Sequence, residues 1–444
     1  MKKSERAVAV STLIEVLENG AYANIALRKA FVDSYQNELD SRGRAFVTEL
    51  VNETLRNLLR IDYVIASFSL TPLEKMKPLI RNLLRISVCQ LRHMNKIPAR
   101  AAVNEAVVLA KAYGFSNLSG FVNGVLRSIA REPEKPTFSF DFQTQPVNYL
   151  HLQYSYPKWM AESLIKWLGK DKALDFCESS HQIPSVTVLP NVIKNTLNEL
   201  AENLKIEGVE CTIGDGFLTL KNTADITKLS SFKDGRFFVI DPGAIFAVKA
   251  LNPKPGQTII DLCAAPGGKA LAAAGLMGNK GKLYAFDIHP HRVDLISTAA
   301  KRLGLNCIQP KVKDILNDEP HFYGMADAVL LDAPCSGLGT IRKRPDIKFT
   351  RQLSDINTLA EKQRDMLDRA SNYVKPGGIL VYCTCTVAKE ENIKNIRWFL
   401  QHYPFAIRPL ENLPPFPYYI EENCLQILPS SENDGFFVAA LVRN

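Results

Sequence analysis

The sequence predicts a protein of three parts: an all-α N-terminal domain, a small α/β middle domain and a C-terminal α/β domain with a mostly parallel sheet. Its 444 residues exceed the length of one ordinary domain. Apolar residues recur at spacings of three and four through the first 130 residues, as they do in amphipathic helices. From residue 236 onward, short apolar strands alternate with helical segments, which is typical of a doubly wound sheet.

The expected boundaries follow from these changes of pattern. The helical domain spans residues 1–135, and residues 136–148 form a linker because they combine prolines with a lack of periodicity. Residues 149–235 mix helical segments with short strands and form the middle domain. Residues 236–444 form the C-terminal domain, in which strands and helices alternate.

Positive charge is concentrated in the N-terminal third of the chain. The whole chain has 54 Lys and Arg against 46 Asp and Glu, a formal net charge of +8. Residues 1–135 hold 20 basic and 13 acidic side chains, which leaves +7 of that excess in this region. A basic domain attracts polyanions, so RNA or DNA is an expected partner. An ordinary solvated helical surface is the alternative interpretation.

The cysteines indicate a reducing compartment. Their number is nine, an odd count scattered along a long chain, which suits free thiols better than a disulfide framework. Cys383 and Cys385 have no histidine nearby, and the chain has no CxxC motif, so no metal site is expected. No apolar run is long enough to cross a membrane. We therefore expect a cytoplasmic monomer without a membrane partner.

A glycine turn follows the first strand of the C-terminal domain. Residues 259–269 read IIDLCAAPGGK, so an apolar strand leads through Gly267 and Gly268 into a helix. Such turns at the carboxyl edge of a parallel sheet bind nucleotides, because glycine admits a ligand close to the backbone and the helix start offers free amides. Asp287 ends the next strand, a position suited to a ribose diol. A plain structural turn would explain the glycines alone.

Two later strands carry a carboxylate and cysteines to the same edge. ADAVLLDAPCSGLGT (326–340) runs into Asp332 and Cys335, and GILVYCTC ends in Cys383 and Cys385. The carboxyl ends of parallel strands line one crevice, so these side chains are expected to converge. A buried core thiol is the alternative for each cysteine. We expect Cys383, which lies further back in its strand, to be such a packing thiol.

These segments resemble those of a known enzyme family. IIDLCAAPGGK, LLDAPCSGLGTIRKRPDIKF and LVYCTCTVAKEEN resemble the motifs of RNA cytosine-C5 methyltransferases that use S-adenosylmethionine. PARAAVNEAVVLAK and GFVNGVLRSIAR, in the helical region, are similar to the NusB-like RNA-binding domain. The combination resembles the bacterial 16S ribosomal RNA members of that family over nearly the whole chain. It implies a Rossmann-like catalytic domain and a middle domain that contacts RNA.

The resemblance also implies roles for individual residues. Cys385 would be the nucleophile that adds to C6 of cytosine, Cys335 would assist product release, and Asp332 would meet the base near the methionine end of the cofactor. Asp287 would contact the ribose hydroxyls of S-adenosylmethionine, and Asp314 its adenine edge. The implied contacts to the methionine portion are Cys263, Ala264, Ala265, Pro266, Gly267, Gly268 and Lys269.

One more segment is expected to hold RNA. Residues 341–351, IRKRPDIKFTR, carry five basic side chains directly after the Pro-Cys motif, and we expect a lid that contacts phosphates. Two alternative functions stay open: C5 methylation of another RNA such as transfer RNA, and a non-catalytic RNA-binding factor of ribosome assembly. The second alternative would not need Asp332, Cys335 or Cys385.

Overall fold

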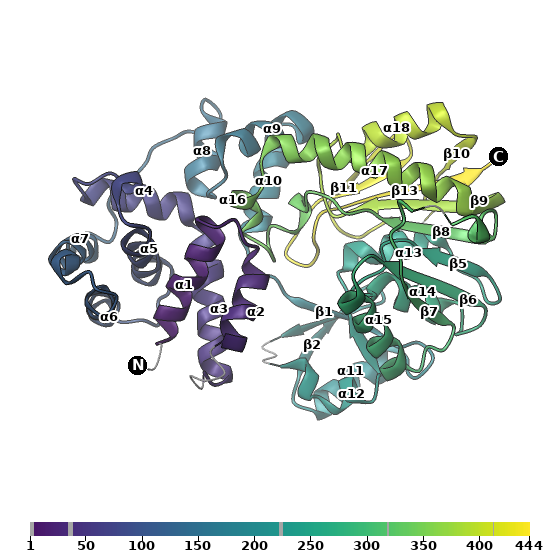
Figure 1. Ribbon diagram of the computed structural model, residues 1–444, viewed down its shortest axis with the longest axis horizontal. Coiled ribbons are helices and arrows are strands. Elements are labelled where there is room, and N and C mark those ends of the chain that lie inside the picture. Colours follow the sequence, from purple (N-terminus) through teal and green to yellow (C-terminus); the bar gives the residue numbers. More distant parts are fainter. Residues whose placement is uncertain (1–3, 34–38, 222–224, 318, 412) are drawn as a thin grey trace. The chain divides into compact units, whose positions relative to one another are not determined.

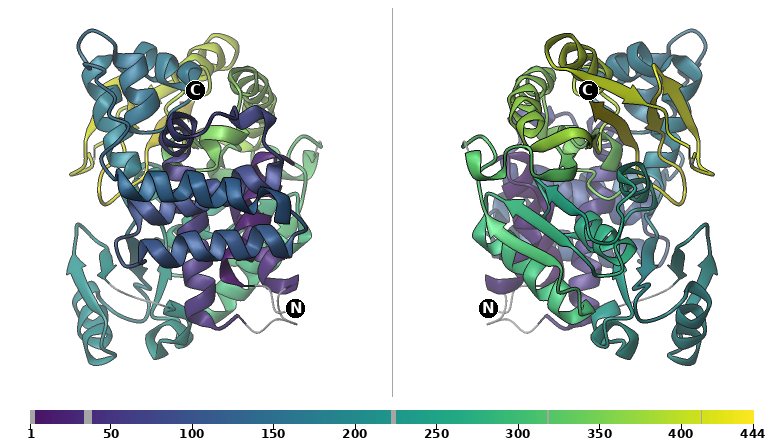
Figure 2. Two further views of the ribbon diagram at one scale, coloured as in Figure 1. Left: turned by 90° about the vertical axis from the view of Figure 1, so that its left-hand side faces the viewer. Right: turned by 90° about the vertical axis from the view of Figure 1, so that its right-hand side faces the viewer.

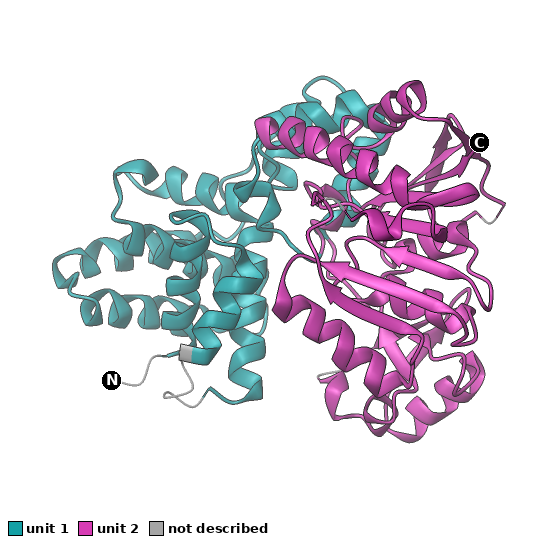
Figure 3. Ribbon diagram, turned by 45° about the vertical axis from the view of Figure 1, so that its right-hand side comes forward, with its two compact units in different colours: residues 1–181, 343–352 teal, residues 182–342, 353–444 magenta. Residues whose placement is uncertain are grey.

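The computed structural model describes residues 4–33, 39–221, 225–317, 319–411 and 413–444 (Figures 1 and 2). They form two compact units (Figure 3). Unit 1 comprises residues 1–181 together with 343–352, and unit 2 comprises residues 182–342 together with 353–444. The chain therefore crosses from one unit to the other three times.

Unit 1 is helical, as the periodicity predicts. Ser4 and Asp40 cap the first and third helices, because each side chain accepts a hydrogen bond from the amide three residues later. The helices bury their apolar stripes against each other, with Leu13, Leu50 and Leu84 at the centre of the core. The helices are α1 (Glu5–Leu17), α2 (Ala23–Asp33), α3 (Ser41–Arg56), α4 (Leu58–Phe68), α5 (Pro78–His93), α6 (Ala99–Ala112), α7 (Ser119–Arg131), α8 (Pro146–Gln153), α9 (Lys158–Leu168), α10 (Lys170–His181) and α16 (Ile347–Thr350).

The boundary between the units lies later than the one predicted. Helices α8–α10 belong to unit 1, so the expected middle domain at 149–235 is divided after His181. Contacts beside α8 help to explain this division, because the hydroxyl of Ser155 accepts a hydrogen bond from the backbone N–H of Arg60 on α4 at 3.3 Å. The residues expected to form the linker have no helix or strand before Pro146.

Unit 2 begins with a small antiparallel sheet. Its strands are β1 (Val186–Pro190), β2 (Glu210–Ile213), β3 (Leu218–Lys221) and β4 (Phe237–Val239), in the order β2-β3-β1-β4. Helix α11 (Leu197–Ile206) follows β1, and the short α12 (Ser230–Lys233) precedes β4, which gives a βαββαβ arrangement. Val188, Leu204 and Phe237 form a core between sheet and helices, whereas Phe238 joins the larger core of the unit.

A nine-stranded sheet forms the centre of unit 2. Its order is β11-β12-β13-β9-β8-β5-β6-β7, with β10 paired to β13. Neighbours from β9 to β7 are parallel, and the pairs involving β10–β13 are antiparallel. The predicted α/β fold is confirmed, with an antiparallel edge on its parallel part. The strands are β5 (Thr258–Asp261), β6 (Lys282–Asp287), β7 (Ile308–Val312), β8 (Ala326–Asp332), β9 (Val374–Thr384), β10 (Phe405–Arg408), β11 (Tyr418–Glu421), β12 (Cys424–Ile427) and β13 (Phe436–Arg443).

Helices cover both faces of this sheet. Alternate strand residues point to opposite faces, so Ile259 joins the core with α13, α14 and α15, whereas Ile260 joins the core with α17 and α18. Both faces are therefore buried, as expected for the parallel strands of an α/β protein. The helices are α13 (Pro242–Leu251), α14 (Gly268–Leu276), α15 (Pro290–Leu303), α17 (Leu353–Tyr373) and α18 (Ile393–His402).

The predicted lid at 341–351 is wrong for Arg342. This side chain is fully buried, and its Nη1 donates to the carbonyl oxygens of Ser430 at 2.8 Å and Ser431 at 2.6 Å. Its Nη2 lies 3.3 Å from the carboxylate of Asp434. A charge at this depth requires partners, and this one uses its guanidinium to hold a neighbouring loop.

The next residues, 343–352, fold into unit 1. Lys348 is buried, and its Nζ donates to the last carbonyl of α3, that of Arg56, at 2.8 Å and to the carbonyl of Tyr154 at 2.9 Å. Asp346 is also buried and accepts a hydrogen bond from the backbone N–H of Ala23, the first residue of α2, at 3.1 Å. Both side chains satisfy helix ends, so Lys348 is not a phosphate contact either.

We predict that Arg342→Met strongly destabilises unit 2, because Asp434 would be left buried without its cation. Removing one partner of a buried pair typically costs about 3–5 kcal/mol. Urea unfolding followed by tryptophan fluorescence measures the change. Lys362→Met, at an exposed position of α17 in unit 2, is the control and should unfold at the wild-type midpoint. An Arg342→Met protein as stable as this control would contradict the assignment.

The buried Lys348 should make stability depend on pH. Burial, followed by the charge of Arg56, lowers the pKa of Lys348 to about 7, whereas an unfolded lysine keeps its proton to about pH 10. Between these values the unfolded chain binds the proton and the folded protein does not. The free energy of unfolding should therefore rise with pH, by at most about 1.4 kcal/mol per unit from this group. Below the pKa of the folded protein, Lys348 is protonated in both states, so its contribution to the free energy of unfolding no longer changes with pH.

Lys348→Met should remove this rise. Urea midpoints measured between about pH 7 and about pH 9 give the slope for each protein. Lys362→Met should keep the wild-type slope. Identical slopes in wild type and Lys348→Met would show that the buried amine does not titrate in this range.

Candidate active site

A cleft of about 230 Å³ lies at the carboxyl edge of the parallel strands in unit 2. Strand β5 leads to β6 and β7 on one side, while β8 and β9 lie on its other side. Such a reversal of strand order is where open α/β sheets bind ligands. Many of the predicted site residues line the cleft: Ala264, Ala265, Pro266, Gly268, Lys269, Asp332 and Cys385.

The structure brings two of the cysteines together. The sulfur atoms of Cys335 and Cys385 are 3.3 Å apart, although fifty residues separate them in the chain. The hydrogen bond between the two thiols, followed by burial, raises the pKa of Cys335 well above its ordinary value. Cys335 is therefore held as a thiol, and either sulfur can donate the hydrogen bond between the two. Cys385 lines the cleft whereas Cys335 does not, which makes Cys385 the better candidate for a nucleophile and Cys335 its hydrogen-bonding partner.

Cys383 belongs to the core. It is fully buried, in agreement with the prediction of a packing thiol, and its sulfur lies 3.5 Å from Oδ1 of Asp332. Burial, followed by the charge of Asp332, raises its pKa well above the ordinary value. Cys383 is thus an un-ionised thiol behind the cleft, on the strand that presents Cys385.

An ion pair lies on the floor of the cleft. Nζ of Lys269 is 2.6 Å from Oδ2 of Asp332, and both side chains are largely shielded from solvent. Burial alone would lower the pKa of Lys269, but the charge of Asp332 and those of neighbouring acidic groups outweigh it, so the pKa is raised. Lys269 therefore keeps its proton and offers a fixed positive charge with N–H donors beside Cys385.

The loop after β5 provides backbone close to the cleft. Gly267 has φ +112°, which L side chains rarely adopt, and it starts α14 without a side-chain cap. The first amides of α14 therefore have no helix partner and are suited to polar ligand groups. Cys263 and Gly267 lie in this loop but do not line the cleft, whereas Ala264–Pro266 and Gly268–Lys269 do.

Asp287 and Asp314 follow neighbouring strands along the same edge. Asp287 ends β6, accepts a hydrogen bond from the backbone N–H of His289 at 3.0 Å and pairs with Arg292 at 3.2 Å. Asp314 follows β7 and accepts from the backbone N–H of Leu316 at 3.0 Å. Both lie outside the lining of the cleft itself, so their contacts with a cofactor stay predictions.

Asp261, the last residue of β5, is an acidic residue just before the glycine loop that sequence reasoning missed. It is buried, and its two oxygens make no hydrogen bond of normal geometry with other described residues. Burial, followed by the charge of Asp332, raises its pKa to about 8, against the opposing effect of Lys269. A carboxylate at the end of an otherwise apolar strand was the signal that could have revealed it, since such groups are rarely fully buried.

The opposite wall of the cleft is built by distant loops. Asp241 caps α13 through the N–H of Gly243 and also accepts from the backbone N–H of Asp434. Asp434 in turn pairs with Arg342. Asp241, Asp434 and Phe436 line the cleft opposite the glycine loop, so the buried arginine shapes the site without entering it.

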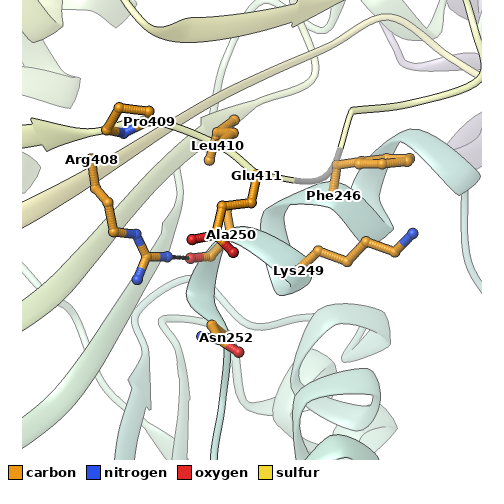
Figure 4. A pocket seen from close by; sticks show the side chains of 8 residues that line it. All are labelled: Phe246, Lys249, Ala250, Asn252, Arg408, Pro409, Leu410 and Glu411. Atoms are coloured by element: carbon orange, nitrogen blue, oxygen red, sulfur yellow. Dashed lines mark hydrogen bonds between the residues drawn. The ribbon is translucent and has the colours of Figure 1, made fainter.

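A second, smaller cavity of about 80 Å³ lies near the end of α13 (Figure 4). The guanidinium of Arg408 donates to the carbonyl oxygen of Ala250 there, as the dashed line in Figure 4 marks. Arg408 thereby satisfies one of the open carbonyls at the C-terminal end of this helix. Arg408 therefore caps the helix, and none of the predicted site residues lines this cavity.

The described part of the chain contains no helix that is both long enough and apolar enough to cross a membrane. It also contains no group of three or more His, Cys, Asp or Glu side chains arranged to hold a metal ion.

Comparison with protein families separates the helical region from the α/β region. Residues 3–131 match the NusB family, and residues 248–442 match the family described as 16S rRNA methyltransferase RsmB/F. Solved structures agree with this fold. The crystal structure of PH0851 is 30% identical, covers 98% of each chain and has a TM-score of 0.80. A methyltransferase homolog protein from Pyrococcus horikoshii is 28% identical over 67% of this chain and 99% of its own, with a TM-score of 0.59.

The curated relatives are similar to this chain over the helical region and the α/β region together. The probable ribosomal RNA small subunit methyltransferase B of Bacillus subtilis is 38% identical over 99% of each chain, and its counterpart in Synechocystis is 35% identical over 99% of each chain. The ribosomal RNA small subunit methyltransferase B of Vibrio vulnificus is 31% identical, again over 99% of each chain. With a NusB region, a methyltransferase fold and full-length relatives of this kind, the chain belongs to the RsmB/F family of 16S rRNA methyltransferases.

Proposed function

We propose that the protein methylates C5 of a cytosine in 16S ribosomal RNA, with S-adenosylmethionine as methyl donor and Cys385 as nucleophile. One observation carries the proposal: Cys385 lies 3.3 Å from Cys335 in a cleft that also contains the Lys269–Asp332 pair. A protein that only binds RNA has no use for two thiols and a buried ion pair in one cleft. Covalent catalysis at a weakly nucleophilic carbon requires such groups.

The residues at the sheet edge suit S-adenosylmethionine. The sulfonium is a cation, and β5, β6 and β8 each end in an acidic residue, Asp261, Asp287 and Asp332, at the sheet edge where the cofactor would bind. Asp261 has no hydrogen-bond partner of normal geometry among the described residues, which suits a ligand donor group. The loop 263–269 would hold the methionine portion, with Asp287 at the ribose and Asp314 at the adenine. When bound, the cofactor supplies an electrophilic methyl group.

Cys385 would begin the reaction by adding to C6 of the cytosine. The thiolate forms a C6–S bond, and the displaced electron pair makes C5 nucleophilic enough to accept a methyl group. Negative charge develops on the ring as the bond forms. The Lys269 ammonium, held by Asp332 at 2.6 Å, can stabilise this charge because its raised pKa keeps it protonated. Asp332 would thus act at the base together with Lys269.

Release of the product reverses the addition. After methyl transfer, C5 loses its proton to a base, the C5–C6 double bond returns and the C6–S bond breaks. The departing sulfur then carries the electron pair of that bond. The thiol of Cys335 can donate a hydrogen bond to it from 3.3 Å, which lowers the energy of the leaving thiolate. This geometry supports the proposed role of Cys335 in product release.

The RNA substrate is proposed from the relatives and the helical unit. The relatives are named for the small-subunit ribosomal RNA, and the basic excess lies in the N-terminal third, which matches the NusB family. A cytosine must leave its stack to reach the cleft. The proposed substrate implies a cytoplasmic enzyme, and a monomeric state stays a prediction.

Bisulfite sequencing of RNA from cells with and without this gene tests the proposed function. We expect one or more cytosines of 16S ribosomal RNA to lose protection when the gene is removed. Protection lost only from transfer RNA would instead support the second substrate. No change at any cytosine would leave a binding role in assembly and would rule out the methylation that we propose.

The two cysteines should have opposite phenotypes. Cys385→Ala should abolish methyl transfer from labelled S-adenosylmethionine and also the covalent protein–RNA complex seen on denaturing gels. Cys335→Ala should retain adduct formation, lose turnover by about 10²-fold or more and accumulate the complex. Cys211→Ala, a half-buried thiol in the small sheet, is the control. Adduct loss in Cys335→Ala rather than Cys385→Ala would reverse the assignment.

A further inference from the structure

Two loops carry the reactive thiols away from the sheet. Strands β8 and β9 are parallel neighbours that pair up to Asp332 and Cys383. Beyond this point the chain continues as the loop 334–339 on one side and the loop 385–392 on the other. The distance between Cys335 and Cys385 therefore depends on interactions outside the strand ladder.

A buried carboxylate supports the first loop on both sides of Cys335. Oε2 of Glu391 accepts a hydrogen bond from the backbone N–H of Ser336 at 2.9 Å and from Nε2 of Gln363 at 2.8 Å. The same Nε2 donates to the carbonyl oxygen of Pro334 at 3.0 Å. The peptide groups before and after Cys335 are thus both held, one by Gln363 and the other by Glu391.

Glu391 is itself fixed to the strand that leads to Cys385. The hydroxyl of Tyr382, on β9, donates to the backbone carbonyl of Glu391 at 2.6 Å and lies 3.1 Å from Oε1 of Gln363. A second bridge connects the loops next to the cysteines, where the hydroxyls of Ser336 and Thr386 are 2.7 Å apart. The backbone N–H of Gly339 also donates to the carbonyl oxygen of Cys385 at 2.9 Å. Glu391 is therefore one of three links between the two loops, and it is the one that holds the peptide group after Cys335.

Glu391 is a charged residue in a buried position. The side chain is completely inaccessible, and burial of a carboxylate is costly unless its hydrogen bonds repay the lost hydration. Burial of an apolar residue would cost less free energy, but such a residue could not accept hydrogen bonds from the two N–H groups. The carboxylate also lies close enough to Cys335 to help keep that thiol protonated. Position and charge are thus two separable contributions of one side chain.

We propose that Glu391 is a positioning residue of the methyl-transfer reaction. It accepts hydrogen bonds from the Ser336 amide and the Gln363 side chain, and these bonds hold Cys335 at hydrogen-bonding distance from Cys385. The inference rests on the proposed function, since it assigns Glu391 to the release step. Glu391 touches neither the base nor the cofactor in this role. It acts through Cys335.

Two substitutions separate position from charge. Glu391→Gln keeps an acceptor oxygen at the same distance from the backbone and removes the charge, whereas Glu391→Asp keeps the charge and withdraws the oxygen by one methylene. Glu390→Gln is the matched control, because this neighbouring, partly buried glutamate pairs with Lys394 at 2.8 Å and makes none of the contacts to Ser336 and Gln363 described above. Thermal unfolding of all three full-length variants establishes that each one is folded.

The first measurement reports the distance between the sulfurs without requiring activity. Diamide oxidises two adjacent thiols to a disulfide and is itself reduced to the hydrazine, so the rate of Cys335–Cys385 cross-linking, followed by peptide mass mapping, depends on their proximity. We expect Glu391→Gln and Glu390→Gln to cross-link at the wild-type rate and Glu391→Asp to be at least about tenfold slower. A wild-type rate in Glu391→Asp, or a slow rate in Glu391→Gln alone, would overturn the proposal.

The second measurement places the effect in the reaction. With unmodified 16S ribosomal RNA transcribed in vitro, Glu391→Asp should lower kcat and increase the fraction of protein trapped as covalent RNA adduct, and Glu391→Gln should restore both. A fall in kcat without any change in the adduct fraction would indicate a purely structural role and contradict the proposal. If the wild-type protein neither forms an adduct with this RNA nor transfers a methyl group to it, the proposed function fails, whereas the cross-linking rates still decide the position of Cys335.

Discussion

The parallel pairing of β8 with β9 is the constraint on which the candidate site depends. Register places Asp332 opposite Cys383, so the two strands end at the same height and their loops leave the sheet side by side. The backbone N–H of Ala333 extends this ladder to the carbonyl of Cys383. A register shift of one residue would turn the side chains to the opposite face of the sheet. It would carry Asp332 away from Lys269 and separate the two reactive thiols.

The parallel strands β5, β6 and β8 also bring acidic residues to one sheet edge. Asp261, Asp287 and Asp332 are all strand-terminal residues, and Lys269 is the cation that pairs with Asp332. Such crowding opposes folding, because a nearby negative charge makes the ionisation of a carboxyl group less favourable. Burial first, and then the charge of Asp332, raises the pKa of Asp261 to about 8. Under the proposed function, the positive charge of a bound sulfonium would offset part of this electrostatic cost.

The sequence alone was sufficient for the fold class and for the convergence of Asp332, Cys335 and Cys385, because strand ends in a parallel sheet must meet. It was insufficient wherever a polar side chain is satisfied by residues far away in the chain. Arg342 and Lys348 look like surface cations in a basic segment, and only the tertiary structure shows that carbonyl oxygens of other loops and helices surround them. Glu391 was equally inconspicuous beside Glu390. The division after His181 depends on packing that helical periodicity does not reveal.

The short segment 343–352 has a consequence for how the protein can be divided. Neither compact unit is a continuous stretch of chain, because this segment belongs to the helical unit and is flanked on both sides by the α/β unit. A fragment that starts at residue 182 would therefore carry Asp346 and Lys348 without the helix ends that they satisfy, together with the apolar side chains of Ile347 and Phe349. Such a fragment is expected to be less soluble than the intact chain.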